Sequence, residues 1–283
     1  MSRELRALAR DTLEILDAGH YVAPRGGRVA LADRISAAVA GTKLHVPGEP
    51  IAPHVTGGAA PVVEVTREST LAATRRLAAD GDVAALVFAS AKNPGGGFRT
   101  GAQAQEESLA RAAALYPCLT AVPEYYNFHR AQANPLYSDR VIYSPRVPVF
   151  RDDDGRLLDA AYEVSFLTAA APNRGAVRHN RAAQVATLLA ARARRVLTVA
   201  AVHGHRRLVL GAWGCGVFRN DPSTVADAFA DALGAASGWF DHVVFAVMDH
   251  VRGAPVHKAF AARFPAELKR LPGHPDEDDR RLP

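Results

Sequence analysis

Apolar positions recur along this chain with two different periods, which predict helices and strands in alternation. Leu8, Thr12 and Ile15 follow one another at spacings of four and three, so residues 3–18 are predicted to form an amphipathic helix. The run 84–89 is apolar without a break, which is typical of a strand buried on both faces. Further strands are predicted at 28–32, 61–66, 140–143, 147–150, 162–168, 195–200, 207–210 and 243–248, and further helices at 69–79, 104–116, 178–195, 222–233 and 254–264. This alternation indicates an α/β protein whose largely parallel or mixed sheet is flanked by helices.

Segments without either period indicate how the chain is organised. Prolines and glycines interrupt residues 21–60, which are therefore predicted to be irregular, and residues 1–60 are interpreted as an accessory N-terminal helical segment. Residues 61–268 would form the main domain, and the charged residues 269–283 a flexible tail. The aromatic, proline-punctuated stretch 116–137 is expected to be a loop or short helices near the functional site.

Two glycine-rich loops follow predicted strands. The first, 93–107, reads N-P-G-G-G-F-R-T-G-A-Q-A-Q-E-E, and the second, 211–221, reads G-A-W-G-C-G-V-F-R-N-D. Glycines let main-chain N–H groups approach a phosphate or ribose closely, and Asp221 before Pro222 marks a helix start, where anions bind readily. Loops at the carboxyl ends of neighbouring strands flank one crevice in open α/β sheets. A diphosphate is therefore expected to bind between the two loops.

Composition and charge narrow the class of protein. The 283 residues are 48% hydrophobic and 22% charged, enough for one sizeable core. The net charge of +5 fits a polyanionic partner, although proteins without such a partner often carry a similar excess. Cys118 and Cys215 have no C-x-x-C spacing, and the N-terminus lacks the apolar region of a signal peptide. No apolar run approaches the roughly 18 residues of a membrane helix. These features predict a soluble, cytoplasmic protein.

Glu106 and Glu107 close the first loop at the start of a predicted helix. One interpretation is structural, because acidic side chains stabilise a helix N-terminus by roughly 0.3–1 kcal/mol each. The other is catalytic: paired carboxyl groups beside a sugar suit cleavage of an acetal through an oxocarbenium-like transition state. Neither loop matches a Walker or G-x-G-x-x-G sequence, and G-x-S-x-G and H-E-x-x-H are absent, which disfavours kinases, Rossmann dehydrogenases, serine hydrolases and zinc proteases. The neighbouring glycines favour the catalytic interpretation.

The first loop carries a resemblance to a known family. Three glycines, Gly95–Gly97, then seven residues, then Gln105–Glu107 resemble the signature of the bacterial-type poly(ADP-ribose) glycohydrolases. Asn93 and Pro94 before the glycines, and the second loop, are similar to the same family over roughly residues 60–265. The resemblance implies a three-layer α/β/α macrodomain with a mixed central sheet, residues 61–268, preceded by an N-terminal helical extension. It implies hydrolysis of poly(ADP-ribose) to ADP-ribose without metal or organic cofactor, reversing ADP-ribosylation in the response to DNA damage.

The resemblance also implies roles for individual residues. Glu107 would protonate the leaving 2′-oxygen and then deprotonate water, which requires a raised pKa, while Glu106 would bind the distal ribose. Asn93 would hydrogen-bond that ribose, and Gln105 would position the carboxylate loop. The remaining binding residues implied are Gly95, Gly96 and Gly97 at the ribose end, Gly214, Cys215, Gly216 and Val217 at the diphosphate, and Phe218 packing on the distal ribose.

Other candidate sites have simpler explanations. Cys215 has no evident histidine partner and is expected to be a small filler rather than a nucleophile. His203 and His205 lack further ligands at metal spacing, and the run 152–155 is expected to be a tight turn rather than a calcium loop. Partners are expected to be poly(ADP-ribose), ADP-ribose and possible ADP-ribosylated proteins, with no membrane, no direct nucleic-acid contact and a monomeric state.

Two alternatives stay open. A macrodomain reader would hold ADP-ribose without turnover, although a reader has no need of carboxylates beside the anomeric carbon. A related hydrolase would act on mono-ADP-ribosyl proteins. Whether chains are cut only at their ends depends on whether Arg219 or the stretch 116–137 blocks the ribose beyond the cleaved bond.

Overall fold

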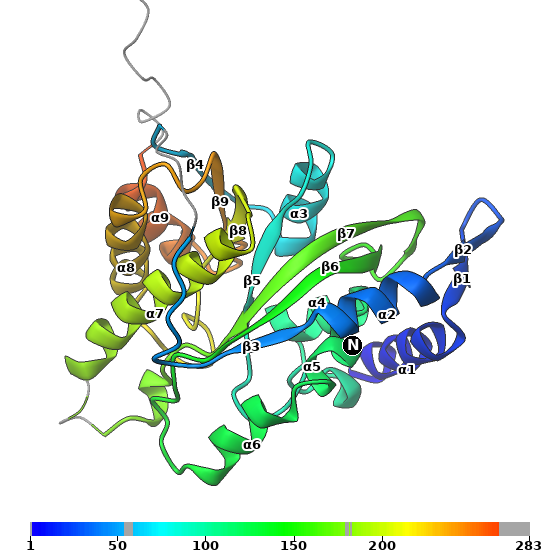
Figure 1. The fold of residues 1–283 in the computed structure, drawn as a ribbon, viewed down its shortest axis with the longest axis horizontal. Helices are drawn as coiled ribbons and strands as arrows, with labels where there is room; N and C mark the ends of the chain where they lie inside the picture. The colour runs from blue at the N-terminus through cyan, green and yellow to red at the C-terminus, as the bar shows by residue number, and fades with distance from the viewer. Residues whose placement is uncertain (1, 54–58, 179–180, 182, 266–283) are drawn as a thin grey trace, which may run out of the picture.

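One seven-stranded mixed sheet forms the centre of the molecule (Figure 1). The computed structural model describes residues 2–53, 59–178, 181 and 183–265. The strands lie in the order β3–β6–β7–β5–β8–β9–β4. The pairs β3–β6 and β6–β7 are antiparallel, and the other four neighbouring pairs are parallel. Their bounds are β3 Lys43–His45, β4 Val62–Thr66, β5 Ala84–Phe88, β6 Val141–Arg151, β7 Leu157–Ala169, β8 Arg207–Leu210 and β9 His242–Ala246.

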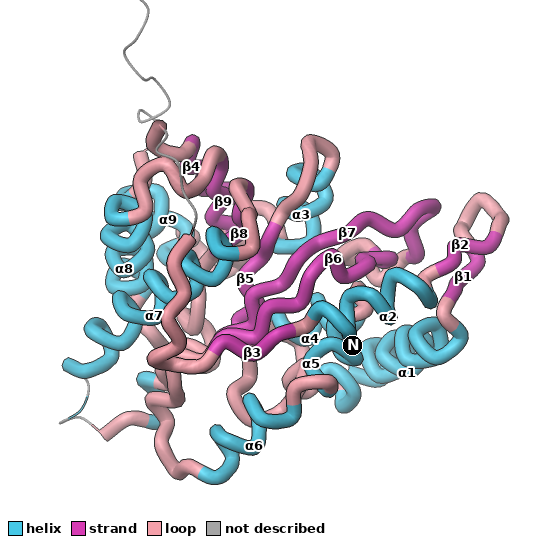
Figure 2. The backbone as a smooth tube through the Cα atoms, viewed as in Figure 1, coloured by secondary structure: helices cyan, strands magenta, loops and turns pink. Residues whose placement is uncertain are grey.

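Helices cover both faces of the sheet, as Figure 2 shows, which confirms the predicted three-layer α/β/α arrangement. One face carries α7 (Ala183–Val202), α8 (Pro222–Ala235) and α9 (Pro255–Arg263). The other carries α2 (Ala32–Gly41), α3 (Thr70–Ala78), α4 (Gln105–Ala112) and α5 (Leu115–Thr120). Alternate residues of β5 enter the two cores: Leu86 packs with the first set of helices, and Val87 with the second. β5 is therefore buried on both faces, as its unbroken apolar run predicts.

The N-terminal part of the chain is more regular than predicted. The amphipathic helix is confirmed as α1 (Ser2–Ala18), and a small hairpin follows, formed by β1 (His20–Val22) and β2 (Arg28–Ala30). The prediction that residues 21–60 are irregular is wrong, because α2 and β3 lie there, and β3 is an edge strand of the main sheet.

Three other element predictions need correction. The strand predicted at 195–200 is the last third of α7, whose apolar face continues through Val196 and Ala200 into the core. The predicted strands 140–143 and 147–150 are one strand, β6, with an irregularity between Ser144 and Val147. The predicted helix 104–116 ends at Ala112, because the next residue forms a bridge with β6.

Two 3-10 helices and one further α-helix lie in the connections between the elements already described. They are η1 (Phe98–Thr100), η2 (Arg174–Ala176) and α6 (Pro123–Ala131). The tight turn predicted at 152–155 joins β6 to β7 and is closed by a hydrogen bond from the Gly155 N–H to the Asp152 carbonyl, 3.0 Å. No helix among the described residues is long and apolar enough to cross a membrane. The predicted tail 269–283 lies outside the described residues.

Candidate active site

Both glycine-rich loops begin at the carboxyl ends of strands in the centre of the sheet. The first follows β5 and the second follows β8, and these strands are parallel neighbours. The approach is close, because a Cβ built on Gly211 would lie 3.0 Å from the Phe88 ring and 2.6 Å from the Ala246 carbonyl oxygen. The loops therefore meet at the carboxyl ends of adjacent strands, where ligands bind in open α/β sheets.

The first loop folds back on itself through two glycines in the left-handed region. Gly95 and Gly96 have φ of 68° and 59°, and the Gly96 N–H donates to the Asn93 carbonyl at 3.0 Å. The Asn93 side chain is exposed, and its amide has no hydrogen-bond partner in the part of the chain that the structure describes. This amide is therefore available to a ligand beside the first loop.

Glu106 and Glu107 lie in the first turn of α4, and each is held by a main-chain N–H. The Gly97 N–H donates to Glu107 Oε1 at 2.9 Å, and the Ser90 N–H donates to Glu106 Oε2 at 2.6 Å. Gly96 lies against both carboxyl groups, because a Cβ at this position would fall within the Glu107 carboxylate and 3.2 Å from Glu106 Oε2. The glycines and the glutamates thus form one compact unit.

The two carboxyl groups have different environments. Glu106 is only 3% exposed, and its Oε1 has no partner among the described residues. Burial raises the pKa of Glu106 well above its usual value, the Ser90 N–H opposes this, and the charge of Glu107 adds to it. Burial therefore favours the protonated form of Glu106, which can donate a hydrogen bond, while Glu107 is only partly buried.

Gln105 fastens the start of α4 to β5. Its Oε1 accepts from the Phe88 N–H at 2.9 Å, and its Nε2 donates to the Leu86 carbonyl at 2.8 Å and to Thr70 Oγ1 at 3.2 Å. This side chain bonds the strand backbone as a neighbouring strand would. The glutamates that follow are therefore fixed relative to the sheet.

The second loop offers main-chain donors. Gly214 has φ of 75° and lies so close to Asn220 and Ala171 that no side chain fits there. Asn220, which is 2% exposed, closes the loop by donating from its N–H to the Gly214 carbonyl and from Nδ2 to the Pro172 carbonyl, both at 3.0 Å. Within the described chain, the N–H groups of Gly214, Gly216, Val217 and Phe218 have no hydrogen-bond partner.

An aromatic wall borders the second loop. The Phe218 and Tyr137 rings lie 5.8 Å apart, and His129 follows Tyr137 at 5.8 Å. Burial lowers the pKa of His129 to about 4, and its ring nitrogens contact the Tyr125 carbonyl and Ser138 Oγ, each at 2.8 Å. The stretch 116–137 thus contains the short helices α5 and α6, in keeping with its predicted local structure, and ends in a loop whose Tyr137 lies beside Phe218.

The N-terminal helix α1 supports the first loop from outside, a contact that the sequence pattern did not reveal. Ala9 packs with Phe98 and Ala110 in a small buried cluster. Thr12 is fully buried and donates from Oγ1 to the Arg111 carbonyl at 2.7 Å. The Arg111 side chain, 4% exposed, donates to the Ala102 carbonyl at 2.8 Å, inside the first loop. The one feature of the sequence that pointed to Arg111 was its position four residues after Glu107, on the same face of the helix.

Thr12→Val is expected to lower the free energy of unfolding by about 1–3 kcal/mol, because it leaves a buried carbonyl without its donor. Thr12→Ser keeps the hydroxyl and should recover most of the loss. The matched control is Thr198→Val, which removes the same type of bond, 2.8 Å to the Arg194 carbonyl, from an exposed position. Urea unfolding at neutral pH measures all three variants, and equal losses in Thr12→Val and Thr198→Val would contradict the assignment.

Cys215, His203 and His205 contribute to packing and hydrogen bonding within the fold. Burial raises the pKa of Cys215 to about 12, so its thiol stays protonated. His203 stacks on Tyr143 at 3.6 Å and contacts His45 Nε2 at 3.0 Å, and burial lowers its pKa to about 4. His205 Nε2 lies 2.9 Å from the Tyr143 hydroxyl. Among the described residues, no three His, Cys, Asp or Glu side chains are arranged to hold a metal ion.

Acid should weaken the fold through His129 and His203. Both have folded pKa values of about 4, below the unfolded value near 6.5, so the unfolded state binds more protons in this range. Their contribution is complete well above pH 6.5 and is lost as the pH falls towards 4, by up to roughly 3 kcal/mol for each group. Urea unfolding at pH 7.5 and 5.0 measures the loss. The loss should shrink in His203→Gln, and an unchanged pH dependence in that variant would contradict the prediction for His203.

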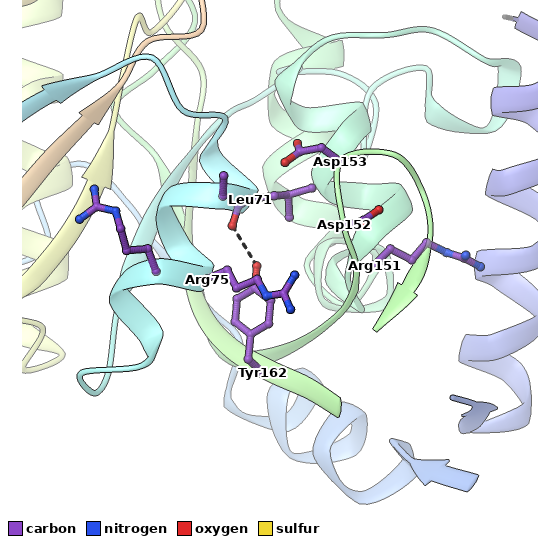
Figure 3. Close-up of a pocket in the computed structure, with 8 residues that line it drawn as sticks. Leu71, Arg75, Arg151, Asp152, Asp153 and Tyr162 are labelled. Carbon is purple, nitrogen blue, oxygen red and sulfur yellow. Dashed lines mark hydrogen bonds between the residues drawn. The ribbon is translucent and has the colours of Figure 1, made fainter. Parts of the chain in front are cut away.

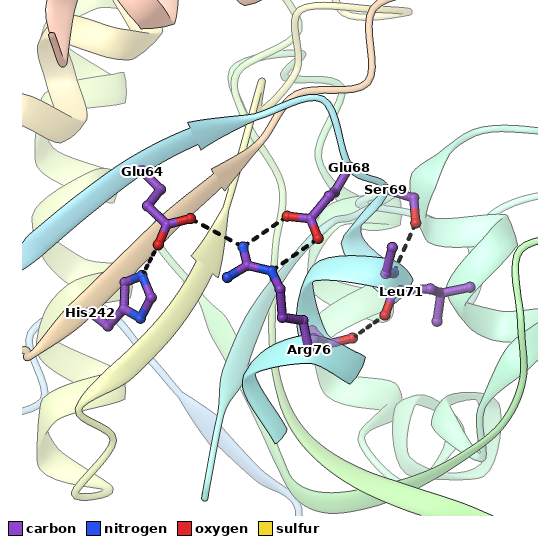
Figure 4. A network of polar contacts seen from close by, with 8 residues as sticks. Glu64, Glu68, Ser69, Leu71, Arg76 and His242 are labelled. Carbon is purple, nitrogen blue, oxygen red and sulfur yellow. Dashed lines mark hydrogen bonds and ion pairs between the residues drawn. The ribbon is translucent and has the colours of Figure 1, made fainter. Parts of the chain in front are cut away.

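Two hollows in the described structure lie away from these loops. One of about 320 Å³ lies between α3 and the β6–β7 turn, where Tyr162 donates to the Leu71 carbonyl at 3.1 Å (Figure 3). Its charges are mostly paired: Arg76 bonds Glu64 and Glu68 in the network of Figure 4, and Arg151 pairs with Asp11. Neither glutamate of the first loop lines it. The hollow is therefore not the candidate site.

Comparisons with known proteins identify the family and the fold. The family model of the microbial-type poly(ADP-ribose) glycohydrolase catalytic domain matches residues 9–152. The crystal structure of poly(ADP-ribose) glycohydrolase from Thermomonospora curvata is 52% identical, covers 93% of this chain and 100% of its own, and superposes with a TM-score of 0.88. The same enzyme bound to the inhibitor ADP-HPD gives a TM-score of 0.87 at the same identity and coverage.

A second enzyme is also similar. Poly(ADP-ribose) glycohydrolase from Deinococcus radiodurans, in complex with ADP-ribose, is 48% identical, covers 82% of this chain and 97% of its own, and has a TM-score of 0.79. A search of curated proteins found no match. The macrodomain-like α/β fold implied by the first loop is confirmed by these superpositions. The chain belongs to the microbial-type poly(ADP-ribose) glycohydrolase family.

Proposed function

We propose that this chain is a glycohydrolase that cleaves the ribose–ribose O-glycosidic bond of poly(ADP-ribose) and releases ADP-ribose. The observation that carries the proposal is the pair Glu106 and Glu107, held by main-chain N–H groups at the edge of the sheet where the second loop presents free N–H groups. The Thermomonospora and Deinococcus enzymes, bound to ADP-HPD and ADP-ribose, support a site for ADP-ribose here.

Glu107 acts first as acid and then as base in this proposal. The Gly97 N–H engages Oε1, which leaves Oε2 to carry the proton. Donation of that proton to the leaving 2′-oxygen breaks the C–O bond, while positive charge develops on the distal ribose. The ionised carboxylate then takes a proton from the attacking water, whose oxygen bonds the anomeric carbon. The products are ADP-ribose and a chain with a free 2′-hydroxyl.

The other predicted residues bind the substrate. The N–H groups of Gly214, Gly216 and Val217, with Cys215 between them, would hold the diphosphate, whose charge also stabilises the developing cation. Phe218 would pack on the distal ribose. Glu106, whose burial favours the protonated form, would bind a hydroxyl of the distal ribose together with the exposed Asn93 amide. Gly95 and Gly96 shape this end of the crevice, and Gln105 positions α4.

The domain organisation and cellular setting are part of the same proposal. Residues 61–268 would be the catalytic macrodomain, 1–60 an accessory segment that braces it and adds the edge strand β3 to its sheet, and 269–283 a tail. The contacts of α1 with Phe98 and Ala110 support the bracing role. The enzyme would act as a monomer in the cytoplasm, without metal or organic cofactor, and would reverse ADP-ribosylation after DNA damage.

A comparison of substrates tests the function. Wild-type protein is incubated with poly(ADP-ribose), with a mono-ADP-ribosylated protein and with ADP-ribose, each with and without a chelator. The proposal predicts ADP-ribose release from chains, much slower release from the mono-modified protein, and no change with the chelator. Binding of ADP-ribose without release from either substrate would identify a reader instead, and faster release from the mono-modified protein would identify the related hydrolase.

A further inference from the structure

Exposed arginines lie beside the second loop, at the end where Phe218 is placed. Arg174, in η2, and Arg219, directly after Phe218, are both exposed. Neither forms an ion pair with a carboxylate in the described chain, and Asp221, the nearest acid in sequence to Arg219, accepts instead from the Thr224 N–H and hydroxyl. Two uncompensated guanidinium groups therefore face solvent at this rim.

Contacts between η2 and the second loop bring the two arginines together. The Gly175 N–H donates to the Phe218 carbonyl at 3.0 Å. The Arg219 stem lies over Gly175, because a Cβ built there would be 3.2 Å from Arg219 Cδ. Arg174 precedes this glycine, so the two exposed arginines extend from adjoining backbone segments beside Phe218.

The backbone of Arg219 is strained. Its φ is 56°, in the left-handed region that favours glycine, and its N–H donates to the Gly216 carbonyl at 3.0 Å to close the turn. A residue with a Cβ costs free energy in this conformation, and such strain collects at binding and catalytic sites. An arginine at a position that favours glycine indicates that its guanidinium group has a role in binding.

We infer that Arg174 and Arg219 bind the phosphates of the ADP-ribose unit that precedes the one being released. This inference rests on the proposed function. Phe218 would lie at the distal ribose, so the rest of the chain leaves the crevice past this rim. Arginine matches phosphate with paired, charge-assisted hydrogen bonds, and every unit of the chain carries a diphosphate. The surface thus selects polymer over single ADP-ribose.

The test removes both charges and compares polymer with monomer. Arg174→Gln/Arg219→Gln is measured beside Arg10→Gln/Arg194→Gln, which removes two exposed arginines from α1 and α7. The site variant should show a KM for long chains about tenfold higher, an unchanged kcat, and an ADP-ribose affinity within about twofold of wild type. For the site variant, the slope of log kcat/KM against log salt concentration should be smaller in magnitude by about 1.4 than for the wild type. Each phosphate neutralised by an arginine contributes roughly 0.7 to this slope, and the variant lacks two such contacts. The control pair should match wild type.

Three outcomes separate the possibilities. A chain KM equal to that of the control pair overturns the inference. An ADP-ribose affinity that falls as much as the chain KM rises also overturns it, because the arginines would then serve the diphosphate of the released unit. If the wild type itself releases no ADP-ribose from chains, the proposed function fails, and direct binding of the polymer to both double variants still decides whether this rim binds its phosphates.

Discussion

Glu107→Gln is expected to lower kcat for ADP-ribose release by at least about a thousandfold. One side chain supplies both the acid and the base, and each role contributes roughly 10²- to 10⁴-fold. Glutamine keeps an oxygen that can accept the Gly97 N–H, now at 2.9 Å, so the loop should keep its shape. The expected pattern is a kcat loss with little change in ADP-ribose affinity. Single-turnover assays and calorimetry measure the two quantities.

The matched control is Glu124→Gln, which neutralises an exposed carboxylate in the first turn of α6. It tests whether loss of any helix-start carboxylate is enough to reduce activity, and it should keep wild-type kcat. A Glu107→Gln enzyme within tenfold of wild type would contradict the acid–base role. Loss of ADP-ribose binding in the same variant would instead assign Glu107 to binding.

Gly96→Ala is expected to reduce kcat/KM by about a hundredfold or more while the protein stays folded. The new Cβ would fall within the Glu107 carboxylate, and φ of 59° is unfavourable for alanine. The carboxylate must therefore move, and a misplacement of about 1 Å can cost about 10²-fold in rate. Gly234→Ala is the control, because its Cβ meets nothing within 4 Å. Wild-type kcat/KM in Gly96→Ala would show that the glycine does not set the carboxylate position.

The sequence pattern predicts the elements that carry the site, because their signals are local. The unbroken apolar run before the glycines marks β5, and Asp221 with Pro222 marks the start of α8. The pattern fails where short elements lie between proline and glycine, as at α2 and β3. It also fails at 195–200, where valine-rich sequence resembles a strand but continues the buried face of α7. Tertiary packing decided that segment against local preference.

The site is predicted less completely than the fold. The candidate residues within each loop were suggested by the glycine-rich pattern and the family resemblance, whereas the residues that support the loops come from distant parts of the chain. Thr12 bonds Arg111, and Asn220 bonds Pro172, across 99 and 48 positions. Such contacts leave no periodic trace in one sequence. The sequence also did not show which glutamate is buried. Burial raises the pKa of Glu106, and this burial is evident only from the structure.

Product analysis of poly(ADP-ribose) digests, with wild type beside Glu107→Ala, tests the central claim most directly. Mass-resolved chromatography separates ADP-ribose from fragments that a phosphate-cleaving enzyme would give. The predicted result is ADP-ribose as the product of the wild type, and none above background from Glu107→Ala, which still binds ADP-ribose. ADP-ribose release by Glu107→Ala at the wild-type rate, or fragments cut at the diphosphate by the wild type, would contradict it.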